Sequence, residues 1–101
     1  MTRIAAFVPD LMDRSKVAAA GGADVTFVGS PAELSRAGAE LVVVDLARPG
    51  VLEALADLGD VRSIGFASHV DRALADAANA AGCSEVLPRS RFFSSLGDLL
   101  A

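Results

Sequence analysis

Apolar residues gather in short runs along this chain, and a segment with helical character follows each run. Runs of small and β-branched residues, typical of strands buried on both faces, lie at residues 3–8, 23–28, 41–45, 61–67 and 85–87. The helical segments predicted after them are residues 10–20, 30–37, 51–58, 68–81 and 92–100. Residues 88–90 are expected to form a loop before the last helix, which Gly97 weakens. Five strand-then-helix units therefore make up the chain.

Two of the helices carry start signals. Ser30, Pro31 and Glu33 fit an N-cap, a proline at the first helical position and the glutamate of a capping box. Ser68 is expected to cap the fourth helix, with Asp71 three residues further on.

Strands that alternate with helices predict a parallel sheet covered by helices on both faces. Right-handed crossovers and five strands favour a three-layer α/β flavodoxin-like fold with strand order 2-1-3-4-5, as a single domain over residues 1–101. In such sheets sites lie at the carboxyl ends of the strands, where the strand order reverses. Asp10 and Asp45 follow the first and third strands, so we expect them side by side at this edge.

The charge balance narrows the range of partners. With 13 Asp and Glu against nine Lys and Arg, the formal net charge is −4, so no nucleic acid is expected as a partner. The chain has no apolar run of membrane-spanning length and does not begin like a signal peptide, so we expect a cytoplasmic protein that does not enter a membrane. Cys83 is the only cysteine, which indicates a packing residue and excludes a disulfide framework.

The third strand and its end resemble a known family. In the segment from Val42 to Pro49, three valines lead to Asp45 and a proline follows four residues later. This segment is similar to the phosphoacceptor strand of bacterial response-regulator receiver domains (the CheY-like family), and the likeness covers nearly the whole chain. It implies that a histidine kinase donates a phosphoryl group to the aspartate. It also implies a Mg²⁺ ion that acidic residues after the first strand hold. Two further side chains complete the site, a Ser or Thr after the fourth strand and a Lys after the fifth. These cations and donors would balance the charge of the phosphoryl group.

By this resemblance, Asp45 is the phosphoacceptor candidate and Asp10 is the ligand of a weakly bound Mg²⁺. Pro9 stands where receivers carry their other acidic residue, and it offers no ligand. One metal carboxylate of the family pattern is therefore missing.

The rest of the family pattern is also incomplete. The hydroxyl position falls on Ala67 or, after a shift of one residue, on Ser68, and spacing alone leaves both open. Arg89 takes the lysine position, so the positive charge is kept but a planar guanidinium group replaces the compact ammonium group. Val86 replaces the aromatic residue that receivers carry in the fifth strand. The chain therefore resembles a degenerate or atypical receiver, a pseudo-receiver.

The acidic residues have a second interpretation. Asp45 can be a phosphorylatable nucleophile, or a strand-ending residue that pairs with Arg89 or Arg48. Asp13 is expected to be a solvent-exposed charge that complements the helix dipole, although it could add a carboxylate beside Asp10 if the first helix begins late.

Residues near the ends of the fourth and fifth strands also have two interpretations. His69 can sense charge at the pocket, or it can be an ordinary surface residue. Arg89 and Arg91 can form a partner surface with Phe92 and Phe93, or the phenylalanines can belong to the core.

The favoured hypothesis is a stand-alone receiver-like signalling domain that is not an enzyme and acts through contact with a protein, either a histidine kinase or another signalling protein. The first alternative is a working phosphoacceptor in which Asp45 attacks, Asp10 holds Mg²⁺ and Arg89 neutralises the acyl phosphate, with Ser68 as the candidate hydroxyl. The second alternative is a small anion- or metabolite-binding protein that uses the same edge of the sheet. The sequence gives no prediction of the oligomeric state.

Overall fold

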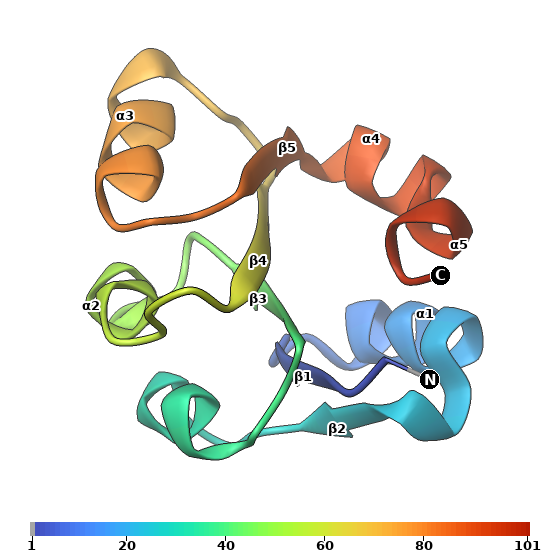
Figure 1. Cartoon of the computed structure of the whole chain (residues 1–101). Helices are drawn as coiled ribbons and strands as arrows, with labels where there is room; N and C mark the ends of the chain where they lie inside the picture. The colour runs from blue at the N-terminus through green and yellow to red at the C-terminus, as the bar shows by residue number, and fades with distance from the viewer. Residues whose placement is uncertain (1) are drawn as a thin grey trace.

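Five parallel strands form one sheet in the order β2-β1-β3-β4-β5, which confirms the predicted topology (Figure 1). The computed structural model describes residues 2–101. The strands are β1 (Ile4–Phe7), β2 (Val25–Phe27), β3 (Leu41–Asp45), β4 (Arg62–Ala67) and β5 (Glu85–Pro88). The helices are α1 (Leu11–Gly21), α2 (Val51–Ala56), α3 (Arg72–Ala80), α4 (Arg89–Ser94) and α5 (Leu96–Leu99), with 3-10 turns η1 (Gly22–Asp24) and η2 (Pro31–Arg36).

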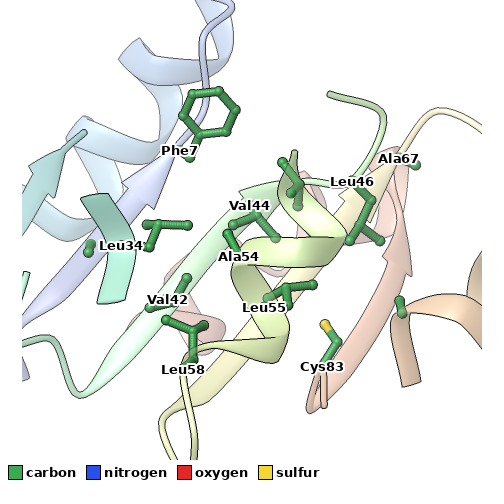
Figure 2. Packing of buried hydrophobic residues seen from close by; sticks show 13 residues of the cluster. Phe7, Leu34, Val42, Val44, Leu46, Ala54, Leu55, Leu58, Ala67 and Cys83 are labelled. Atoms are coloured by element: carbon green, nitrogen blue, oxygen red, sulfur yellow. The ribbon is translucent and has the colours of Figure 1, made fainter. Parts of the chain in front are cut away.

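Helices cover both faces of the sheet, as the strand pattern predicts. Figure 1 shows α2 and α3 on one side of the strands and α1, α4 and α5 on the other. Side chains of β3 alternate between the two cores, so that Val42 and Val44 belong to the first and Val43 to the second. Leu34 of η2 and Leu55 of α2 pack in the first core (Figure 2). Because β3 is buried on both faces, it is the central element of the molecule.

Cys83 lies in the first core, as expected of a packing residue. Its thiol donates to the carbonyl oxygen of Glu85 at 3.2 Å. Burial raises the pKa of the Cys83 thiol above its ordinary value, so the sulfur stays protonated at neutral pH.

Two helices and one strand differ from their predicted form. The segment after Ser30 is a 3-10 turn rather than an α-helix, although the Glu33 carboxylate accepts from the Ser30 amide at 2.7 Å as a capping box requires. The helix expected from Ser68 begins at Arg72, because the carboxylate that accepts from the Leu74 amide, at 2.8 Å, is that of Asp71. The second strand is also shorter than predicted, since η1 takes up its first residues.

The end of the chain was predicted less well. Residues 88–90 do not form a loop, because β5 runs to Pro88 and α4 starts directly at Arg89. The last helix is divided in two at Ser95, whose φ of −111° and ψ of 15° are not helical, rather than merely weakened at Gly97. No helix within residues 2–101 is both long and apolar enough to cross a membrane.

Candidate functional site

An open pocket of about 470 Å³ lies at the carboxyl ends of β1, β3, β4 and β5. The residues that line it are Asp10, Asp13, Asp45, Ala47, Arg48, Pro49, Ser68 and Arg89. All four predicted site residues, Asp10, Asp45, Ser68 and Arg89, therefore meet in one place, as the topology of a parallel sheet requires.

Asp45 ends β3 with a largely buried carboxylate. Its Oδ1 accepts from the backbone N–H of Ala47 at 3.0 Å, and its Oδ2 accepts from Nε of Arg48 at 3.3 Å. Both carboxylate oxygens of Asp45 are thus engaged by its own loop, and its ion-pair partner is Arg48 rather than Arg89.

Asp13 is buried, contrary to the expected solvent-exposed charge, with an exposed fraction of only 1%. The guanidinium group of Arg89 binds the Asp13 carboxylate through both of its terminal nitrogens. Nη1 donates to Oδ2 at 2.7 Å and Nη2 donates to Oδ1. This bidentate pair joins α1 to the start of α4 across 76 positions of sequence.

Arg89 is also held by aromatic rings. Its guanidinium carbon lies 5.0 Å from the ring centre of Phe93, and Phe93 packs edge-on against buried Phe92 at 4.9 Å. The bond to Asp13 raises the pKa of Arg89, and the nearby charges of Asp10 and Asp45 act in the same direction. Phe92 therefore belongs to the second core, with Phe93 packed against it, and Arg89 lines the pocket.

Asp10 is the exposed member of the three carboxylates. It caps α1, because its Oδ1 accepts from the backbone N–H of Asp13 at 3.0 Å. It has no salt bridge to a basic side chain within residues 2–101.

The two residues on which the family's hydroxyl position can fall, Ala67 and Ser68, differ in their surroundings. Ser68 is exposed and lines the pocket, whereas Ala67 is buried in the first core. His69 is exposed and is not among the lining residues.

The side chains present do not fit a divalent metal ion as they are arranged. Two of the three carboxylates already bind a guanidinium group. In the part of the chain that the structure describes, no group of three or more His, Cys, Asp or Glu side chains is placed to hold a metal. Mg²⁺ requires nearly octahedral oxygen ligands, and only Asp10 has no competing arginine.

No protein-family model matches this sequence, and a search of curated proteins finds no match. Comparison with solved structures does find proteins of similar fold. A response regulator from Hahella chejuensis superposes with a TM-score of 0.84 at 15% identity, over 99% of this chain and 92% of the other. This chain has a CheY-like receiver fold.

Two further structures show how widely this receiver fold is shared. The Mn²⁺-bound form of response regulator Rcp1 matches with a TM-score of 0.79 and 14% identity, over 98% of this chain and 91% of the other. A putative pilus assembly protein (cpaE) from Burkholderia thailandensis matches with a TM-score of 0.74 and 19% identity, over 99% and 95%. At these identities the likeness is one of fold, and one protein with the fold holds a divalent metal.

One feature of the sequence could have shown that Asp13 is buried. Asp13 lies four positions before Val17, which is fully buried, so the two side chains share one face of α1. A carboxylate on the buried face requires a partner, and Arg89 was the cation expected at the same edge of the sheet.

Proposed function

We propose that this receiver-fold domain signals through contact with another protein and does not use phosphorylation of Asp45 as its switch. The observation that carries the proposal is the state of the Asp45 carboxylate, which already accepts from Ala47 and Arg48 through both oxygens. The receiver fold of the neighbours, including one named as a response regulator, supports a role in signalling.

Phosphoryl transfer to Asp45 would need a free carboxylate oxygen and a bound cation, and this pocket offers neither readily. A carboxylate oxygen must approach a highly charged phosphoryl group while cations neutralise the charge that develops. Each Asp45 oxygen already accepts one hydrogen bond, which lowers its nucleophilicity, and Pro9 supplies no ligand for an ion beside Asp10. We therefore expect Mg²⁺ to bind weakly at best, with Asp10 as its first ligand.

The phosphoacceptor alternative retains some support from geometry. Asp45 and Arg89, which the family resemblance matches to acceptor and cation, line the same pocket as Ser68, one of the two residues on which the hydroxyl position can fall. The test must therefore be able to detect a working acceptor.

The wild-type chain is incubated with Mg²⁺ and acetyl phosphate, and separately with beryllofluoride, beside an active receiver domain as the donor control. We expect no phosphoryl adduct by intact mass and no change in amide NMR shifts around Asp45. The Asp45→Asn variant should behave like the wild type. An adduct or a shift that Asp45→Asn abolishes would instead establish the phosphoacceptor.

The contact itself is tested by chemical cross-linking in the source cells. The wild-type and Asp45→Asn chains should cross-link to the same protein partner to the same extent, because the contact does not depend on phosphorylation. Loss of the partner in Asp45→Asn alone, or no partner with either chain, would contradict the proposal.

A further inference from the structure

A small, mostly apolar groove lies between η2 and α2, and it shares no lining residue with the acidic pocket. Figure 1 shows η2, drawn in teal, beside α2 on one side of the sheet. We propose that this groove binds an arginine side chain of the protein partner. The inference deepens the proposed function and rests on it in one respect, namely that the domain acts through contact with another protein.

The apolar part of the groove is formed by small residues of the two elements. Gly50 has a φ of 84°, and a Cβ atom there would lie 3.6 Å from Cγ of Pro31. The proline ring therefore packs against the backbone of Gly50, and the other apolar lining residues are Ala32 and Ala54. The groove has a volume of about 240 Å³. Pockets for small-molecule ligands span roughly 300–1,000 Å³, so this one suits a single side chain better.

Two carboxylates, those of Glu53 and Asp57, complete the groove and give it a negative charge. The two residues lie four positions apart along α2 and its C-cap, and both are exposed. Within residues 2–101 neither of them forms a salt bridge with a basic side chain. Like charges at this spacing repel each other, so a cation bound between them would relieve the repulsion.

An arginine side chain matches both the apolar and the charged part of the groove. Its methylene stem packs on apolar surface while its charged end stays close to water. Its planar guanidinium group offers several donors to carboxylates and is less strongly hydrated than the ammonium group of lysine. Arginine is also enriched among the residues that dominate protein interfaces. The net charge of −4 on this chain favours the approach of a basic partner surface.

The first test is a titration of the wild-type chain with the blocked peptide acetyl-Gly-Arg-Gly-amide, followed by amide NMR. We expect saturable shifts centred on Ala32, Gly50 and Ala54. The same peptide with citrulline in place of arginine keeps the stem but loses the charge. It should bind at least about fivefold more weakly.

Two groove variants and one control extend the titration. Glu53→Gln/Asp57→Asn removes both charges with little change in shape and should weaken binding of the arginine peptide at least about fivefold. Ala32→Trp fills the groove from an exposed position without a change in charge and should also weaken it. The control Asp76→Asn/Asp98→Asn changes the net charge equally at exposed positions outside the groove, so it should bind like the wild type.

Cross-linking in the source cells then tests whether the partner itself uses the groove. Both groove variants should cross-link to the partner at least about fivefold less than the control variant does. Equal cross-linking would overturn this inference and leave the proposed function intact.

The peptide titration decides the inference independently of the partner. It is overturned if the wild type shows no saturable shift at the groove, if the shifts centre on Asp10 instead, or if arginine and citrulline peptides bind equally. A phosphoryl adduct at Asp45, or no cross-linked partner with any chain, would instead contradict the proposed function.

Discussion

A single carboxylate, that of Asp13, joins the first helix of this chain to its fourth. It sits at the buried face of α1 and is bound by Arg89, which begins α4. A buried charge is tolerated only when a partner offsets the loss of water, and here the partner is bidentate. Asp10, one turn earlier, is exposed and serves as the cap of the same helix.

Replacing Asp13 with Asn should therefore lower the free energy of unfolding by about 1–3 kcal/mol, because the guanidinium of Arg89 loses its charged acceptor. Asp10→Asn is the matched control. It should change stability by less than about 0.5 kcal/mol, since asparagine caps helices as well as aspartate does. Urea unfolding followed by circular dichroism measures both. Equal losses in the two variants would show that the buried pair adds nothing beyond an ordinary surface charge.

At the scale of elements, the residue that follows β3 packs closely against β4. The Leu46 amide donates to the Phe66 carbonyl at 2.8 Å, which folds the Leu46 side chain over Gly65 of β4. A Cβ atom at Gly65 would lie 2.7 Å from two carbon atoms of Leu46. A side chain at position 65 would therefore force Leu46 to move.

The Gly65→Ala variant should consequently lose about 1–3 kcal/mol of stability through overpacking. Gly97→Ala gives the opposite expectation. Gly97 lies in α5 with no atom within 4 Å of an added Cβ, so alanine should stabilise the chain by up to about 1 kcal/mol. Thermal unfolding of both variants measures the difference. A neutral Gly65→Ala variant would mean that Leu46 moves aside at little cost.

At the scale of the whole molecule, burial is uneven across the sheet. All residues of β1 and β3 are buried, whereas β5 at the edge is only partly covered. Its neighbour α3 buries only Ala78 fully. Fewer buried apolar contacts therefore stabilise β5 and α3 than stabilise the central strands β1 and β3.

Hydrogen exchange should follow this gradient. The amides of β1 and β3 are expected to exchange slowest, near the rate set by global unfolding, while those of β5 and α3 open earlier through a partial unfolding. Exchange followed by NMR at neutral pH measures the order. Equal protection of Val86 and Val43 would indicate that the domain opens only as one unit.

The sequence by itself determined the architecture of this protein. Strand runs, helix spacing and crossover handedness are local or topological rules, and they gave the sheet order, both helical layers and the edge at which Asp10, Asp45, Ser68 and Arg89 meet. The errors concerned the form and the bounds of single elements: the segment after Ser30 is a 3-10 turn, β2 is short, and the fourth helix is capped by Asp71 in place of Ser68.

Only the tertiary structure decided which charges pair. The pattern placed acids and arginines at one edge, but both Arg48 and Arg89 were open to Asp45, and Asp13 was assigned to solvent. The bond between Asp13 and Arg89 spans 76 positions and depends on how α1 and α4 pack against the same sheet face. Sequence patterns report which face a residue occupies, whereas ion pairs depend on distances of a few ångströms that only the packed chain fixes.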